Sequence, residues 1–247
     1  ESKNFLARSL ELEEYIKTVV CICDYIKGKK HSKRAVNLSL DEWNVWYHSH
    51  GAKFDKWSKA PSILEDVYNF ADALLVGLML ITMLRHCDRV KVACMAQLVN
   101  VIAPIMTETG GAAWAQTIFY PFMQVSRYGR GTALLPVIKT TRHDTVDFTD
   151  VPDMDAMSVF NEENAELTVF AVNRDFTESN ELDIKLTDFP GYKPVEHTVM
   201  AGHELTQTNG KDNAPVVPVR APLPVAENGH VAVALPPLSW NVIRLKG

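Results

Sequence analysis

The first 130 residues alternate helical hydrophobic patterns with short apolar runs. Apolar side chains recur every three to four residues between positions 6 and 27, which predicts an amphipathic helix that ends at Gly28. A second helix is predicted from Ser62, which can form a capping box with Glu65, to about His86. The two patterns together predict a helix-rich first half.

Two nearly all-apolar runs, residues 35–40 and 90–95, are predicted as strands, and a further helical pattern covers residues 112–124. Apolar strands joined by crossover helices indicate a parallel sheet that is buried on both faces. A closed (β/α)8 barrel needs about eight strands and about 250 residues. If this sheet belongs to such a barrel, residues 1–130 form the C-terminal portion of a TIM barrel, its last quarter or third.

From residue 131 the hydrophobic pattern changes to a period of two, which is typical of β-strands. Candidate strands cover residues 134–138, 157–161, 166–173, 182–186, 194–200, 216–218, 230–235 and 240–245. Many short strands separated by turn residues predict an antiparallel, jelly-roll-like β-sandwich. The predicted fold class is α/β plus all-β, with one domain in residues 1–130 and a second in residues 131–247.

Composition and charge narrow the classes of partner. The chain has 247 residues, of which 47% are hydrophobic, and a formal net charge of −5, so no basic field would attract a nucleic acid. The longest apolar run, Ala73 to Leu84, is shorter than the roughly 20 residues that span a bilayer. We expect no membrane association and a cytoplasmic location. Because the chain lacks an initiator Met and a signal-peptide plan, we expect that it begins partway through a longer protein.

Cysteine and histidine spacing predicts neither disulfides nor a metal site. The four cysteines are expected to be buried, reduced thiols: Cys21, Cys23, Cys87 and Cys94. His48 and His50 lie close together, but no third ligand is suggested, so a structural or exposed role is favoured over metal binding. No cofactor is expected.

Candidate chemistry lies where the first apolar strand ends. The run Asp41, Glu42, Trp43 and Asn44 follows it directly, with Trp46 two residues later. In a barrel the C-terminal strand ends carry the active site, and aromatic rings beside carboxylates suit a sugar, which has apolar faces and many hydroxyls. By spacing alone, a structural acid beside core aromatics is an equally good interpretation.

The segment from Leu38 to His48 resembles the nucleophile motif of the glycoside hydrolase family 51 α-L-arabinofuranosidases. The resemblance continues in order along the chain through residues 64–68, 72–74, 88–91, 96–105 and 116–122. It covers nearly all of residues 1–130. The second half is similar in kind to the C-terminal domain of that family, but its sequence is less diagnostic.

The resemblance implies a role for each matching residue. Glu42 matches the catalytic nucleophile at the end of barrel strand 7, and Gln97 matches a substrate-binding glutamine at the end of strand 8. Trp46 matches an aromatic residue that lines the sugar site. Asn44 is placed with the substrate-binding residues, although Asn44 and Asp41 are better interpreted as support that orients Glu42.

The family implies a retaining mechanism, in which Glu42 forms a covalent arabinosyl-enzyme and a second carboxylic acid about 5–5.5 Å away protonates the leaving oxygen. That acid/base glutamate follows barrel strand 4, upstream of this chain, and neither Glu65 nor Glu108 has its context. We therefore expect an N-terminal complementary segment or chain as a partner, an arabinose-containing oligosaccharide or polysaccharide as substrate, and a homo-oligomer. The chain alone is predicted to be inactive.

Two alternative functions remain at this point. One is a related clan glycosidase, such as a xylosidase or endoglucanase with the same barrel and sandwich. The other is a non-catalytic carbohydrate-binding or scaffold fragment in which the sandwich is the working part.

Overall fold

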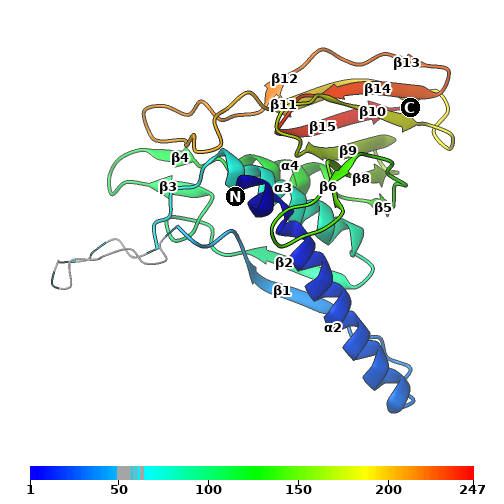
Figure 1. Ribbon diagram of the computed structural model, residues 1–247, viewed down its shortest axis with the longest axis horizontal. Helices are drawn as coiled ribbons and strands as arrows, with labels where there is room; N and C mark the ends of the chain where they lie inside the picture. The colour runs from blue at the N-terminus through cyan, green and yellow to red at the C-terminus, as the bar shows by residue number, and fades with distance from the viewer. Residues whose placement is uncertain (49–56, 58, 60, 62–63) are drawn as a thin grey trace.

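The computed structural model describes residues 1–48, 57, 59, 61 and 64–247. Its helices are α1 (Ser2–Ala7), α2 (Ser9–Lys29), α3 (Phe70–Arg85) and α4 (Phe119–Tyr128). Strands β1 (Leu38–Trp43) and β2 (Val90–Met95) pair in parallel, and α3 lies between them along the chain. In Figure 1, α3 runs between this pair and the large sheet of the C-terminal half.

The remaining strands are antiparallel. They are β3 (Ile105–Thr107), β4 (Ala113–Ala115), β5 (Thr132–Leu134), β6 (Arg142–His143), β7 (Val151–Pro152), β8 (Met154–Asn161), β9 (Glu166–Asn173), β10 (Asn180–Lys185), β11 (Lys193–Met200), β12 (Val219–Arg220), β13 (Ala226–Glu227), β14 (His230–Leu235) and β15 (Ser239–Lys246). One sheet has the order β12-β11-β15-β9-β8-β5 and another has the order β10-β14-β13. The prediction that the second half is rich in sheet is confirmed.

Both faces of the six-stranded sheet are buried, as β9 shows. Val169 and Ala171 share an apolar cluster with Leu182 of the three-stranded sheet. Phe170 and Val172 belong to the other cluster, which contains α3. Because successive side chains of a strand point to opposite faces, every residue of β9 is buried. The layers are the small sheet, the large sheet, α3 and the β1–β2 pair, while the predicted domain boundary at residue 130 stays a prediction.

Helix α3 is the centre of the larger core, and 13 of its 16 residues are buried. Its cluster includes Trp43 of β1 together with Phe170 and Trp240 of the large sheet. Gly77 makes a close approach possible, because a Cβ there would lie 2.7 Å from Cε3 of Trp240. The Trp240 ring is fully buried, and its Nε1 donates to Oε1 of Gln124 at 2.7 Å. The ring therefore has little freedom to move away from the helix.

The start of α3 corrects the predicted helix boundary. Asn69 and Asp72 form a capping box, in which the Asn69 side chain accepts from the Asp72 amide at 3.1 Å and the Asp72 carboxylate accepts from the Asn69 amide at 2.7 Å. The Phe70 amide then donates to the carbonyl oxygen of Gln207 at 2.9 Å. The predicted start at Ser62 lies outside the described residues, and residues 64–69 are not helical, so the prediction of a helix over them is wrong.

Four other predicted elements differ from the structure. The helix predicted over residues 112–124 is confirmed over residues 119–124 and wrong before them, because Gly110, with φ of +68°, turns the chain into the β3–β4 hairpin and α4 begins only at Phe119. The strand predicted over residues 216–218 is wrong, since Pro218 has no amide to donate and β12 follows it. The strand predicted over residues 134–138 ends at Leu134, the last residue of β5. The helix predicted to end at Gly28 continues to Lys29 in α2.

The cysteines are free, as predicted, but the prediction that they are buried is wrong. Three are exposed and Cys23 is half-buried. Cys21 and Cys23 lie on the half of α2 that projects from the body of the molecule, and Cys94 lies on β2, beside which no further strand is found among the described residues.

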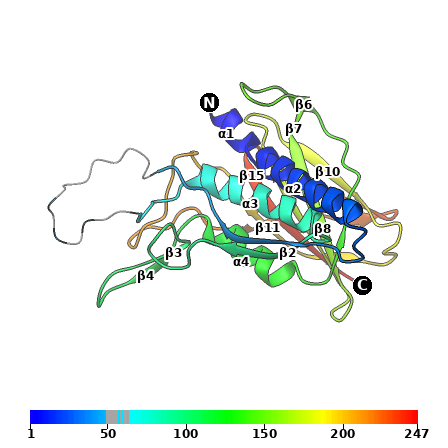
Figure 2. The same cartoon turned by 90° about the horizontal axis from the view of Figure 1, so that it is seen from below.

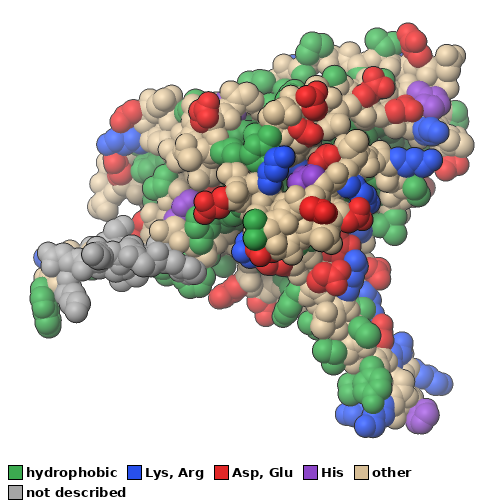
Figure 3. Space-filling view, in the orientation of Figure 1, with side chains coloured by type: hydrophobic (Ala, Val, Ile, Leu, Met, Phe, Trp, Pro, Cys, Tyr) green, Lys and Arg blue, Asp and Glu red, His purple; other side chains and the backbone are tan. Residues whose placement is uncertain are grey.

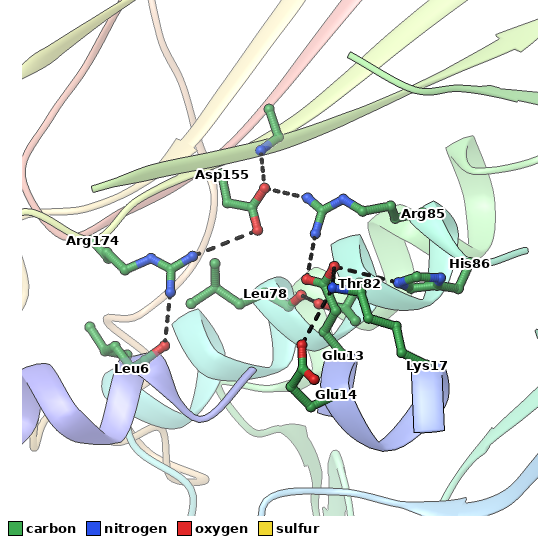
Figure 4. A network of polar contacts seen from close by, with 11 residues as sticks. Leu6, Glu13, Glu14, Lys17, Leu78, Thr82, Arg85, His86, Asp155 and Arg174 are labelled. Atoms are coloured by element: carbon green, nitrogen blue, oxygen red, sulfur yellow. Dashed lines mark hydrogen bonds and ion pairs between the residues drawn. The ribbon is translucent and has the colours of Figure 1, made fainter. Parts of the chain in front are cut away.

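A polar network joins the helical layer to the large sheet. Figure 4 shows Asp155 of β8 between Arg85 of α3 and Arg174, with Nη2 of Arg174 at 3.6 Å from the carboxylate. Arg174 also donates to the carbonyl oxygen of Leu6 at 3.3 Å, and Arg85 pairs with Glu13 at 3.2 Å. Burial lowers the pKa of Arg174 to about 10, so the guanidinium stays charged at neutral pH. The network fixes α1 and α2 against α3 and β8, elements that lie side by side in Figure 2.

We predict that Gly77→Ala destabilises the protein by about 1–3 kcal/mol, because the added methyl group overpacks the contact with Trp240. Gly28→Ala is the matched control, since a Cβ at Gly28 of α2 meets no atom within 4 Å. That change is expected to be neutral or to stabilise by at most about 1 kcal/mol through helix propensity. Urea unfolding of both variants measures the difference, and equal effects would contradict the packing account.

Candidate active site

The end of β1 carries a bulge that exposes Glu42. Leu40 is opposite Ala93 and Trp43 is opposite Met95, so three steps along β1 match two along β2. In regular strand geometry Leu40 and Trp43 would point to opposite faces, yet both pack into the core around α3. The irregularity lets both apolar side chains point inward and leaves Asp41 and Glu42 exposed. The hydroxyl of Ser39 donates to Asp41, so Asp41 is tied to its own strand.

Glu42 and Gln97 lie at the same edge of the parallel pair. The Ala96 amide donates to the carbonyl oxygen of Trp43 at 3.1 Å, and the Gln97 amide donates to that of Ile102 at 3.1 Å. The Gln97 side chain is exposed, as is that of Glu42. Carboxyl ends of adjacent parallel strands meet at one edge of a sheet, so both residues lie at this edge of the pair.

The side chain of Asn44 connects the end of β1 to the loop that follows β2. Its Nδ2 donates to the carbonyl oxygens of Ala96 at 2.8 Å and Ile102 at 2.7 Å, and its Oδ1 accepts from the Val45 amide at 2.8 Å. Both amide hydrogens are thus used inside the protein. This geometry favours a supporting role for Asn44 over direct contact with a ligand.

Beyond Asn44, the chain reaches a buried carboxylate at the start of α3. Asp72 is fully buried, and its Oδ2 lies 2.7 Å from Nε2 of His48. The hydroxyl of Tyr47 lies 3.4 Å from Oδ1 of Asp72. Between these contacts and Asn44 lies Trp46, whose side chain is 50% exposed. His50, the other member of the histidine pair, lies outside the described residues.

Two buried groups that sequence analysis did not single out hold this region together. Asp72 is one, and the spacing Asn69-x-x-Asp72 before an apolar run was a capping-box signal that could have revealed it. Gln116 is the other: its Oε1 accepts from the Tyr68 amide at 2.9 Å, and its Nε2 donates to carbonyl oxygens of Asp66 and Ala103 at 2.9 and 2.8 Å. Nothing in the local pattern around Gln116 signals this long-range role.

Desolvation and the buried carboxylates shift several ionisation equilibria here. Hydrogen bonding to Asp72 raises the pKa of His48 above its ordinary value, and the charges of Asp72 and Asp66 act in the same sense, while burial opposes them. Burial raises the pKa of Tyr47 to about 12 and raises that of Tyr68 still further. The loop after β1 therefore contains a histidine whose pKa lies above its ordinary value.

Two grooves in the described part of the chain lie away from Glu42 and Gln97. A groove of about 400 Å³ lies over β11, β12 and β15, and an apolar groove of about 260 Å³ is lined by Trp43, Phe122 and residues of α3 and β2. Neither groove is lined by Glu42 or Gln97. Glu108 is an exposed residue near the β3–β4 turn, 2.9 Å from Lys211, so it is engaged elsewhere.

The described residues contain no group of three His, Cys, Asp or Glu side chains placed to hold a metal ion. No helix in the described ranges combines the length and apolarity needed to cross a membrane.

A sequence model of the α-L-arabinofuranosidase C-terminal domain matches residues 41–239, from the end of β1 to the start of β15. The chain belongs to this family. The match begins at the bulge that exposes Glu42 and includes both Gln97 and the loop to Asp72. The resemblance to family 51 arabinofuranosidases is thereby confirmed.

Similar proteins agree with this assignment. The chain is 55% identical to an intracellular exo-α-(1→5)-L-arabinofuranosidase 1 of Bacillus subtilis and 52% identical to an intracellular exo-α-(1→5)-L-arabinofuranosidase of Halalkalibacterium halodurans, in each case over 98% of this chain and 49% of the relative. A family 51 α-L-arabinofuranosidase structure from Bifidobacterium longum superposes with a TM-score of 0.90 at 34% identity, over 99% of this chain and 50% of the other. The chain thus spans about half the length of the relatives it matches.

The ionisation of His48 predicts a pH-dependent stability. Because the folded-state pKa is raised, the contact with Asp72 contributes fully below the unfolded pKa of about 6.5 and is lost as pH rises through the folded value. His48→Gln should therefore destabilise by about 1 kcal/mol at acidic pH and by less at alkaline pH. Urea unfolding of both proteins between about pH 5.5 and 8.5 checks this. A difference that stays constant or grows with pH would contradict it.

Proposed function

We propose that this chain is the part of a retaining α-L-arabinofuranosidase that supplies the nucleophile, Glu42. The observation that carries the proposal is the bulged end of β1, which presents Glu42 beside the end of β2 and Gln97, in a chain of this family. A carboxylate on a rigid strand end can attack an anomeric carbon and form a glycosyl-enzyme, which water then hydrolyses. The substrate class is a terminal α-L-arabinofuranosyl residue of an oligosaccharide or polysaccharide.

Other residues of the site take supporting and binding roles in this proposal. Gln97 would hydrogen-bond the sugar, and Trp46 would offer its exposed ring to an apolar sugar face. Asn44 would fix the two strand ends and so hold Glu42 in place, which follows from its saturated hydrogen bonds.

We further propose that β1, α3 and β2 are the end of a TIM barrel that a preceding segment completes. Parallel strands are ordinarily covered on both faces, yet four consecutive residues of β2, 91–94, are exposed. The projecting half of α2 presents large apolar side chains to solvent, namely Ile22, Tyr25 and Ile26, and Figure 3 shows apolar and basic side chains gathered at its tip. Exposed apolar surface of this kind marks an interaction site.

The same segment would bring the acid/base glutamate that the described residues do not supply.

An intracellular location is proposed because similar relatives carry that word in their names. Self-association of the completed enzyme stays a prediction, which light scattering of the assembled protein tests.

We predict that the chain alone does not hydrolyse a nitrophenyl α-L-arabinofuranoside, and that activity appears when it is co-expressed with the N-terminal half of the Bacillus subtilis relative. Glu42→Gln should abolish that activity, lowering kcat by more than about a thousandfold, because no nucleophile remains. Glu181→Gln is the matched control, since Glu181 is an exposed strand glutamate on β10, in the three-stranded sheet.

Each outcome bears on a separate part of the proposal. Turnover by the chain alone that Glu42→Gln removes would overturn the need for a partner. Activity of the assembled protein that survives Glu42→Gln would overturn the assignment of the nucleophile. A nitrophenyl xyloside, assayed in parallel, distinguishes a related clan glycosidase from an arabinofuranosidase.

A further inference from the structure

The loop that follows Glu42 is fixed to the protein at two points. The first is Asn44, whose side chain binds the loop after β2. The second is His48, which binds Asp72 at the start of α3. Trp46 lies two residues from each point. The backbone on both sides of Trp46 is therefore held, whereas Glu42 precedes both points and lies within β1.

At the second anchor, Asp72 makes more contacts than a helix capping box requires. A capping box needs one carboxylate oxygen of Asp72 to accept from the Asn69 amide, which it does at 2.7 Å. His48 adds a second contact to the same oxygen at 2.7 Å, and Tyr47 reaches the other oxygen at 3.4 Å. Because Asp72 is fully buried, its charge must be matched by such donors.

Aromatic packing restricts the same histidine. The Tyr47 ring stacks on His48 with ring centres 4.2 Å apart and an interplanar angle of 29°, and Tyr68 contacts it edge-on at 5.7 Å. Tyr47 is itself held edge-on by Phe5 of α1 at 5.4 Å. The His48 side chain is only 22% exposed. The rings of Tyr47 and Tyr68 and the carboxylate of Asp72 therefore restrict the movement of the His48 side chain.

We propose that His48 is a positioning residue which, together with Tyr47 and Asp72, holds Trp46 in place for sugar recognition. The proposal rests on the proposed function, because it assigns the site of that enzyme a specificity-determining support. His48 touches neither Glu42 nor the sugar in this scheme. It acts through Trp46, and loss of the anchor weakens substrate binding more than it slows bond cleavage.

The kinetic test uses the protein assembled with its N-terminal half and an arabino-oligosaccharide. His48→Leu removes the hydrogen bond and should raise KM about tenfold with kcat changed by less than about twofold. His48→Gln keeps a donor at the Nε2 position and should hold KM within about threefold of the parent. Tyr47→Phe removes the hydroxyl that reaches Asp72 at 3.4 Å and also contacts Asn69, and its effect on KM should be about twofold.

A double-mutant cycle separates positioning from a general structural effect. In a Trp46→Ala background, His48→Leu should produce no further rise in KM, since the group it positions is gone. The proposal would be overturned if His48→Leu raised KM by the same factor with Trp46 present and with Trp46 replaced by Ala. A fall in kcat with KM unchanged would overturn it as well, because His48 would then act on the chemistry.

A second measurement needs no activity. In the isolated chain, the fluorescence of Trp46 is obtained as the difference between each protein and its Trp46→Phe counterpart, and acrylamide quenching reports how firmly the ring is held. Quenching of Trp46 should increase in His48→Leu and stay at the parent level in His48→Gln. Unchanged quenching in His48→Leu would overturn the proposal, whether or not the assembled enzyme is active. Inactivity of the assembled enzyme would by itself count only against the proposed function.

Discussion

The burial of α3 is the constraint on which the rest of the molecule depends. The helix connects the two parallel strands, contacts the six-stranded sheet through the gap at Gly77, and has 13 of its 16 residues buried. A helix that is apolar on all sides must be covered on all sides, and here α1, α2, α4, β1 and the sheet cover it. The antiparallel half therefore shares the core that positions the strand ends of the first half.

The packing of α3 determines how the residues of the candidate site are arranged. Leu40 and Trp43 are drawn to the core around α3, and the resulting bulge leaves Glu42 exposed at the strand end. The N-terminus of α3 contributes Asp72, whose buried charge organises the loop that bears Trp46. The exposed residues of β2 and the apolar side chains on the projecting half of α2 are where we propose that a preceding segment attaches.

Much of the fold was predictable because burial leaves a strong pattern. Strands β2, β9 and β14 have the predicted bounds, since apolar runs or strict alternation define them. The predictions failed where a local feature outweighs the hydrophobic pattern. These features are the Asn69–Asp72 capping box, which delays the start of α3, Gly110, which turns the chain from β3 into β4, and Pro218, which precedes β12. Glu42 and Gln97 could be proposed from the sequence, but the contact between His48 and Asp72 spans 24 positions and no local sequence pattern indicates it.

We propose that Glu42 becomes covalently attached to the sugar. The most direct measurement treats the assembled protein with a slowly hydrolysed, fluorinated arabinofuranosyl donor and locates the added mass by peptide mass spectrometry. The account predicts a single glycosyl adduct on the peptide that contains Glu42, and none in Glu42→Gln. An adduct on another carboxylate, or turnover of the donor with inversion and no adduct, would contradict it.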